Sequence, residues 1–152
     1  MFLEKELVKY GAIVVMTRES DYDLSSANAY WRKKSDFDNR IKLINESDAD
    51  LYLSIHLNYL DDAKYYGAQV FYNKDNDKLA LLVQESLNKH LISDRSVKKI
   101  PTNTYMYSKL NVEGLLIECG FLSNYKERNL LNTSAYQQKI ASTIAEAISK
   151  YY

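Results

Sequence analysis

The sequence predicts an α/β fold in which helices cover both faces of a mostly parallel sheet. Two observations lead to this prediction. Short strands with apolar residues on both faces alternate with segments that have the apolar spacing of amphipathic helices. The chain of 152 residues also contains no internal repeat, low-complexity tract or linker. We therefore expect a single domain, residues 1–152.

The first third of the chain is expected to contain a helix, a strand and a second helix. Residues 2–10 have helical spacing, and Ala12–Met16 (AIVVM) has the composition of a buried strand. Residues 19–34 are polar and irregular, which predicts a surface loop. Ser35 is a candidate N-cap for a helix that ends near Glu46.

The rest of the chain is expected to contain three more strands and two more helices. The strands cover residues 51–57, 68–72 and 115–117. One helix is capped within Asp75–Asp77 and ends near Leu91, and the other begins at Ser134, where Gln137 completes a capping box. A loop over residues 93–111 also contains a candidate short strand, Tyr105–Tyr107.

Composition excludes several classes of partner. Lys and Arg total 20 and so do Asp and Glu, which leaves no electrostatic case for a nucleic acid or an anionic membrane surface. No apolar run approaches the ~20 residues of a membrane span, and the first ten residues are too charged for a signal peptide. The single cysteine, Cys119, rules out an internal disulfide.

Two apolar runs end in groups that bind metal or move protons. LYLSIHLN contains His56, and LLIECGFLSN contains Glu118. In open α/β sheets reactive groups gather beyond the carboxyl ends of the strands, so both side chains are expected at one site. Neutral imidazole is a common zinc ligand, and a nearby carboxylate can accept the proton of a zinc-bound water. The alternatives are a satisfied histidine at a strand end and a buried ion pair of Glu118 with Arg18, Arg40 or Arg95.

The residues around this pair resemble a known family. LYLSIHLN resembles the SIH-[AL]-N stretch, and LLIECGFLSN the LVE-x-GFLSN stretch, of the zinc-dependent N-acetylmuramoyl-L-alanine amidases of bacterial cell walls. The resemblance extends over nearly the whole chain, through GAIVVMTRESDYDL, RKKSDFDNRIKLINESDAD, YYGAQVFYN and YQQKIASTIAEAI. Among the subfamilies, KKSDFDNR, SIHLN, GAQVFY and ECGFLSN are most similar to the germination-specific amidases of the spore cortex.

This resemblance implies roles for individual residues. His56 corresponds to the family's last zinc-ligand histidine and Glu118 to its catalytic glutamate. In the implied reaction, zinc polarises the lactyl carbonyl of muramic acid and activates a water, and Glu118 carries the proton to the departing L-alanine nitrogen. Asn58 is a candidate for orienting the substrate, while Asn124 is expected to cap a turn. The implied substrate is peptidoglycan, an activating protein is a candidate partner, and the implied location is extracytoplasmic, in the cell wall or spore cortex.

The chain also departs from the family. The family's other two zinc ligands, a histidine in a D-x-GHGG loop and a glutamate early in its first helix, have no counterpart here. Because Phe2–Tyr10 resembles the later half of that helix, we expect an N-terminally truncated domain that lacks the family's first strand and has an unpaired, partly apolar sheet edge. A catalytic zinc site takes about three protein ligands, so tight zinc binding through His56 alone is not expected. His90 is a poor replacement, since it lies near the end of a surface helix.

Three other functions follow from the same sequence. The chain could be an inactive remnant that binds peptidoglycan or a partner protein through the retained groove. Cys119 could act as a thiol nucleophile with His56 as its base, although neighbours on a strand point to opposite faces and a packed core role for Cys119 is favoured. A nucleotide-binding domain is disfavoured, because no glycine-rich loop follows any strand and the chain has only 4 glycines.

Overall fold

A four-stranded mixed sheet forms the centre of the computed structural model, which describes all residues from Met1 to Tyr152. The strands are β1 (Tyr52–Asn58), β2 (Gln69–Tyr72), β3 (Lys98–Lys99) and β4 (Gly114–Phe121), in the order β1-β4-β2-β3. β1 runs parallel to β4 and β2 parallel to β3, while β2 and β4 are antiparallel. The predicted α/β fold with a mostly parallel sheet is therefore confirmed.

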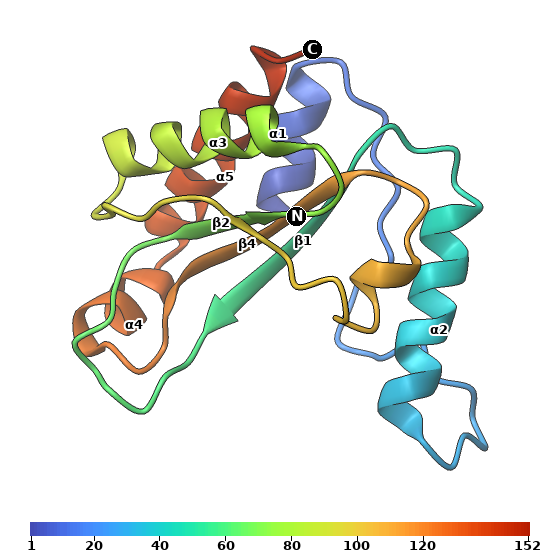
Figure 1. Ribbon diagram of the computed structural model, residues 1–152. Helices are drawn as coiled ribbons and strands as arrows, with labels where there is room; N and C mark the ends of the chain where they lie inside the picture. The colour runs from blue at the N-terminus through green and yellow to red at the C-terminus, as the bar shows by residue number, and fades with distance from the viewer.

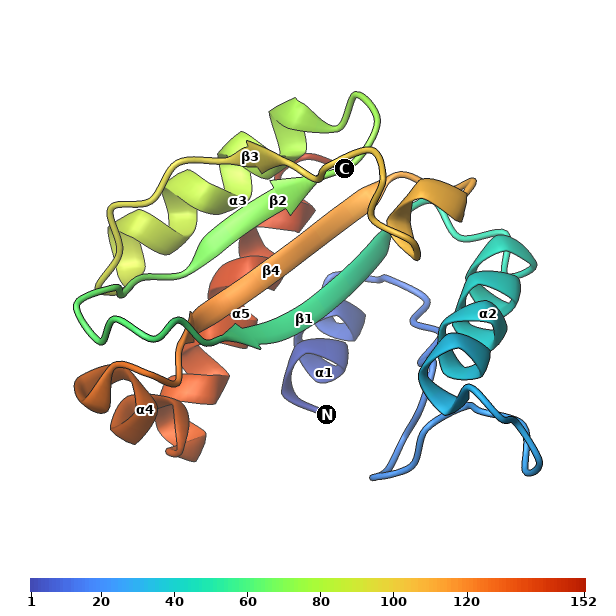
Figure 2. The ribbon, with the colours of Figure 1, turned by 60° about the horizontal axis from the view of Figure 1, so that its bottom comes forward.

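Helices pack on both sides of this sheet. α1 (Phe2–Lys9), α3 (Asp77–His90) and α5 (Ser134–Ser149) form one layer (Figure 1). α2 (Arg32–Asn45) stands on the other side, beyond β1 and the short 3-10 helix Tyr107–Lys109 (Figure 2). The remaining helix, α4 (Tyr125–Leu131), follows the end of β4.

Alternation along the two central strands divides the side chains between two cores. Leu115, Ile117 and Cys119 of β4 enter the main core with the apolar side chains of α3 and α5. On the opposite face, Tyr52 of β1 packs with Ile44 of α2 in a smaller cluster that also contains Phe37, Ile41, Met106, Tyr107, Leu110 and Val112. We call this second side the α2 face, and it carries the candidate site.

A close backbone approach sets the spacing of the two strands at their start. Gly114 lies opposite Tyr52 in the register of β1 and β4. A Cβ atom at position 114 would lie 2.3 Å from the Tyr52 carbonyl oxygen and 2.4 Å from its ring. Only glycine fits this position, and its absence of a side chain lets the Tyr52 ring lie flat over the strand.

The predicted strand Ala12–Met16 is wrong. The segment forms no strand, and Ile13 and Val15 are 96% and 59% exposed. A strand exists only through its ladder of backbone hydrogen bonds, and no neighbouring strand offers one here. An apolar, β-branched composition therefore does not suffice to make a strand.

Three smaller predictions also need correction. Tyr105–Tyr107 forms no strand, because the chain turns into the 3-10 helix at Tyr107. The second helix begins at Arg32, earlier than the predicted Ser35. The N-cap of α5 is Thr133, whose hydroxyl accepts a hydrogen bond from the Tyr136 N–H. Boundaries of this kind depend on local hydrogen bonds that pattern alone does not specify.

The expected unpaired edge lies along β1. This strand has β4 on one side and no neighbour on the other, and Ile55 and Leu57 are each 47% exposed. An exposed, apolar edge strand is a recognised site at which another strand can pair. None of the helices has the length and apolar character needed to cross a lipid bilayer.

Candidate active site

His56 and Glu118 face each other across two adjacent strands. They are partners in the register of β1 and β4, near the carboxyl ends of both strands. Side chains at paired positions of neighbouring strands point to the same face, and here that is the α2 face. The two residues therefore lie opposite each other on the same face of the sheet, as the sequence predicts, and their shared role stays a prediction.

Glu118 is a carboxylate without a partner. Its Oε2 atom is buried and accepts no hydrogen bond, and none of the ion pairs includes Glu118. The alternative of a buried ion pair with an arginine is therefore wrong, since Arg18 donates to the Tyr22 carbonyl, Arg40 pairs with Asp36, and Arg95 donates to the Tyr66 carbonyl. Burial without compensation raises the pKa of Glu118 above its ordinary value.

The imidazole of His56 is held by a chain of hydroxyl groups. Its Nε2 atom shares a hydrogen bond of 3.0 Å with Ser54 Oγ, which lies two residues earlier on the same face of β1. Ser54 Oγ in turn shares a hydrogen bond of 3.0 Å with the phenol oxygen of Tyr107. The Tyr107 ring stacks on Tyr52 at 6.0 Å, so the hydroxyl chain rests on a packed aromatic pair.

Tyr107 also connects the two halves of the site. Burial raises the pKa of its phenol, the hydrogen bond from Ser54 opposes this shift, and the nearby charge of Glu118 adds to it. The phenol thus stays protonated and uncharged at neutral pH. It lies close enough to Glu118 to sense its charge while it contacts the residue that orients His56.

Arg40 of α2 contributes a positive charge that acts on the imidazole. Partial desolvation and the charge of Arg40 both lower the pKa of His56. The lowered pKa favours the neutral ring, which is the form that binds a metal ion or accepts a proton. The guanidinium is fixed by Asp36 Oδ2, at 2.9 Å from Nε, and by Thr17 Oγ1, at 2.9 Å from Nη1. These two contacts hold the Arg40 guanidinium in place on the α2 face.

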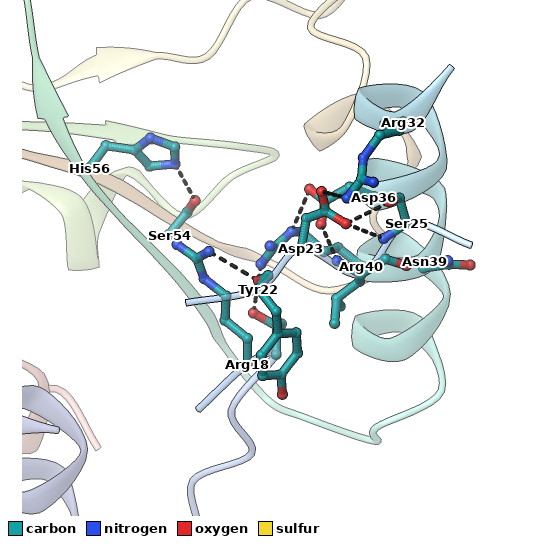
Figure 3. A network of polar contacts seen from close by, with 12 residues as sticks. Arg18, Tyr22, Asp23, Ser25, Arg32, Asp36, Asn39, Arg40, Ser54 and His56 are labelled. Atoms are coloured by element: carbon teal, nitrogen blue, oxygen red, sulfur yellow. Dashed lines mark hydrogen bonds and ion pairs between the residues drawn. The ribbon is translucent and has the colours of Figure 1, made fainter. Parts of the chain in front are cut away.

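The loop before α2 is hydrogen-bonded to Asp36, the residue that also holds Arg40. Asp36 Oδ1 accepts a hydrogen bond from the Leu24 N–H at 2.7 Å, and Asn39 donates to the Leu24 carbonyl. Farther along, Asp23 pairs with Arg32 at 2.7 Å. Figure 3 shows the contacts of Asp23 with Arg32, of Asp36 with Arg40, and of Ser54 with His56. The predicted surface loop is therefore held against α2 along its length.

The two asparagines after the strands differ in their surroundings. Asn58 Oδ1 accepts a hydrogen bond of 2.8 Å from the Tyr59 N–H, and no protein acceptor takes its Nδ2 group. Asn124 is the N-cap of α4, where its Oδ1 accepts from the N–H groups of Lys126 and Glu127. The expected capping role of Asn124 is confirmed, while the substrate contact of Asn58 stays a prediction.

Two other candidate groups lie away from the site. Cys119 points into the main core and is 4% exposed, and burial raises the pKa of its thiol to about 12, with a further contribution from Glu118. The thiol is therefore protonated and inaccessible, which excludes it as a nucleophile. His90 ends α3 on the opposite side of the sheet from His56.

Sequence reasoning missed three residues of this site. Ser54 could have been found, since alternation puts it on the same face of β1 as His56. Tyr107 could not, because it reaches the site from a loop with no local relation to the strand. Arg40 was a candidate only as an ion-pair partner of Glu118, whereas its charge acts on His56. No group of three or more His, Cys, Asp or Glu side chains is arranged to hold a metal ion.

Comparison with known proteins completes this description. The family model described as N-acetylmuramoyl-L-alanine amidase matches residues 2–150. The chain is 42% identical to the germination-specific N-acetylmuramoyl-L-alanine amidase of Bacillus subtilis, over 96% of this chain and 64% of that protein. It is 30% identical to the probable cell wall amidase LytH of Staphylococcus saprophyticus, over 99% of this chain and 46% of that protein.

Solved structures agree with the sequence matches. The fold matches the CwlD amidase from Clostridioides difficile, solved in complex with the GerS lipoprotein, with a TM-score of 0.92 and 37% identity over 99% of this chain and 80% of that one. It also matches the catalytic domain of CwlV from Bacillus (Paenibacillus) polymyxa with a TM-score of 0.81 at 24% identity, which concerns the fold alone. The chain spans less than two thirds of the length of the curated relatives, at 64% and 46%.

Proposed function

The chain belongs to the N-acetylmuramoyl-L-alanine amidase family, and from this premise we propose that it is the catalytic domain of such an amidase. The proposed reaction is hydrolysis of the amide between the lactyl group of muramic acid and L-alanine in peptidoglycan. The 42% identity to a germination-specific amidase favours the spore cortex as the substrate layer. A cell wall or cortex substrate implies an extracytoplasmic site of action.

The observation that carries the proposal is the pair of opposed residues on β1 and β4. His56 and Glu118 occupy partner positions on one face, and Glu118 carries an oxygen that no protein group satisfies. A buried, unpartnered polar atom costs folding free energy and is characteristic of a functional site. No packing or ion-pair role accounts for this carboxylate.

We assign Glu118 as the general base. It takes a proton from the attacking water as the water oxygen adds to the lactyl carbonyl carbon. It then delivers that proton to the L-alanine nitrogen as the C–N bond breaks, which leaves a carboxylate on the sugar and an amine on the peptide. Its raised pKa suits this exchange, because it lies closer to neutral pH than that of an exposed glutamate. Tyr107 and Ser54 are assigned to hold His56, and the free amide group of Asn58 to contact the substrate.

The family resemblance also implies zinc, with His56 as one ligand. The side chains of this chain do not complete a zinc site: His56 is the only histidine on the α2 face, and no three metal-binding groups converge. A catalytic zinc ion takes about three protein ligands. His56 would therefore be a single ligand, and the residues present do not fit a catalytic zinc ion.

One alternative function rests on the incomplete ligand set, although the family match does not favour it. A chain that lacks the metal ligands could bind peptidoglycan, or a protein partner, through the same face without hydrolysing it. The CwlD amidase structure contains a lipoprotein partner, so an activating protein is a second proposed partner for this chain.

One experiment separates these possibilities. Purified chain is incubated with cortex-type peptidoglycan, with and without added zinc, and new amino-terminal L-alanine is measured. We expect release of L-alanine termini that Glu118→Gln lowers at least about 100-fold, since a general base contributes 10²–10⁴-fold. Glu85→Gln, on the exposed side of α3, is the matched control. Peptidoglycan binding with no release under either condition would support the alternative.

A further inference from the structure

The lining residues of a second candidate site place it at the N-terminal end of α2, a helix whose position Figure 2 shows. Four aromatic rings, those of Tyr30, Trp31, Phe37 and Tyr105, line a pocket of about 500 Å³. Arg32, Lys33 and Lys34 complete its wall. We call this the aromatic pocket, and its volume and its aromatic lining with a few charged groups are typical of small-ligand sites.

The rings at the mouth of the pocket are unusually exposed. Tyr30 is 88% and Trp31 is 71% exposed, and the two rings meet edge to face at 5.1 Å. Neither ring belongs to a core cluster. Large aromatic side chains that contribute nothing to a core and gather at one place mark a contact surface.

The pocket carries an excess of positive charge. Arg32 is paired with Asp23 at 2.7 Å and Lys34 with Asp38 at 2.5 Å. Lys33 in the pocket wall lies over the Phe37 ring at 5.8 Å and has no carboxylate partner. Lys109 is not part of the lining, but it lies over the ring of the lining residue Tyr105 at 3.9 Å and also has no carboxylate partner. The chain as a whole has a net charge of zero, so this local excess does not reflect a basic protein. Two unpaired ammonium groups beside aromatic faces complement a ligand with apolar faces and a negative charge.

The back of the pocket is formed by two elements that also contribute to the candidate active site. The Tyr105 phenol donates a hydrogen bond of 2.6 Å to Asp38 Oδ1, which joins the 101–110 loop to α2. That loop presents Tyr105 to the pocket and Tyr107 to Ser54, and α2 presents Phe37 to the pocket and Arg40 toward His56. A polymer bound at the active site would therefore reach the pocket along two shared elements.

We propose that the aromatic pocket is a glycan subsite that binds a peptide-free, carboxylate-bearing sugar of the peptidoglycan strand. This inference depends on the proposed function for the identity of the polymer. The C–H faces of N-acetylated sugar rings pack on Trp31 and Tyr30. Hydrolysis of the lactyl amide leaves a carboxylate on the sugar, and Lys33 and Lys109 pair with that carboxylate. The site thus prefers glycan that the reaction has already processed. This binding keeps the protein attached to the glycan strand on which it acts.

The chain supplies its own probe for a test, because Trp31 is the only tryptophan. Its emission is followed while the purified chain is titrated with a peptide-free tetrasaccharide of alternating N-acetylglucosamine and N-acetylmuramic acid. Parallel titrations use the neutral tetramer of N-acetylglucosamine and the free stem peptide. We expect a saturable change with the acidic glycan, binding about tenfold weaker with the neutral tetramer, and no change with the peptide.

Variants then locate the contact by calorimetry. Trp31→Ala is expected to weaken binding of the acidic tetrasaccharide about tenfold or more, Trp31→Phe less, and Lys33→Gln to remove the preference over the neutral tetramer. The controls are Tyr125→Ala and Lys126→Gln, an exposed aromatic ring and a cation on α4 outside the pocket. Circular dichroism confirms that each variant is folded.

The proposal is overturned if the acidic tetrasaccharide leaves the emission unchanged, if Trp31→Ala and Tyr125→Ala behave alike, or if the stem peptide saturates the site. The measurement needs no turnover. A chain that binds the tetrasaccharide but releases no L-alanine termini would therefore refute the amidase activity and retain the subsite. A chain that releases L-alanine termini through Glu118 but binds no free glycan would refute the subsite and retain the amidase activity.

Discussion

Tyr107 and Ser54 lie 53 residues apart in the chain, and their hydroxyl oxygens are 3.0 Å apart in the fold. Through this contact a loop on the α2 side of the sheet reaches the strand that carries His56, because Ser54 also bonds to the imidazole. The orientation of His56 therefore depends on how the 101–110 loop packs and not on β1 alone.

This contact is expected to stabilise the fold. Tyr107→Phe removes one hydrogen bond and should lower the free energy of unfolding by about 1 kcal/mol, measured by urea denaturation. Tyr125→Phe, on an exposed ring, should have no effect. A double-mutant cycle with Ser54→Ala should give a coupling energy above about 0.5 kcal/mol, and strictly additive effects would mean that the two hydroxyls do not interact.

Glu118 is expected to make stability depend on pH in a defined direction. Its pKa is raised above 4.5 in the folded protein, so ionisation costs folding free energy. The carboxyl imposes no cost below its ordinary pKa, and stability falls as the pH rises through its folded pKa. Glutamine does not ionise. Thermal melts from roughly pH 4 to pH 8 should therefore show Glu118→Gln gaining stability relative to the parent chain as the pH rises. Glu85→Gln should show no such trend, and parallel curves for Glu118→Gln and the parent would contradict the assignment.

Arg40 is expected to control the protonation of His56. Removal of its positive charge in Arg40→Gln should raise the pKa of His56, which lies below 6.5 in the parent protein. NMR titration of the ring protons in metal-free buffer measures this value directly. Lys139→Gln, on the exposed side of α5, should leave it unchanged. A His56 pKa that stays constant or falls in Arg40→Gln would show that the guanidinium does not act on the ring.

Glu127 is expected to hold the loop after the catalytic strand. The residue is 4% exposed, and its two carboxylate oxygens accept hydrogen bonds from the Gly67 N–H at 3.0 Å and the Phe121 N–H at 2.8 Å. Glu127→Ala leaves both buried N–H groups without an acceptor. The free energy of unfolding, measured by urea titration, should therefore fall by about 2–4 kcal/mol. Glu85→Ala serves as the control. A loss below about 0.5 kcal/mol would indicate that water replaces the carboxylate.

The sequence alone determined most of the sheet and the central pair of the site. Short segments rich in apolar residues on both faces predict β1, β2 and β4. Alternation along β1 places Ser54 and His56 on one face, and the position of Glu118 at the end of its run predicts that it joins them. These features follow from periods of two residues and from burial, which are local properties of the chain.

Only the tertiary structure decided what surrounds this pair. Pairing of β1 with β4 in register brings His56 opposite Glu118, and packing of α2 and the 101–110 loop brings Arg40 and Tyr107. The same packing gathers Trp31 and Tyr105 into one pocket. Ala12–Met16 has the composition of a strand but finds no partner. A residue's own properties specify its conformation and its burial, whereas its contacts depend on segments far along the chain that meet only when the fold closes.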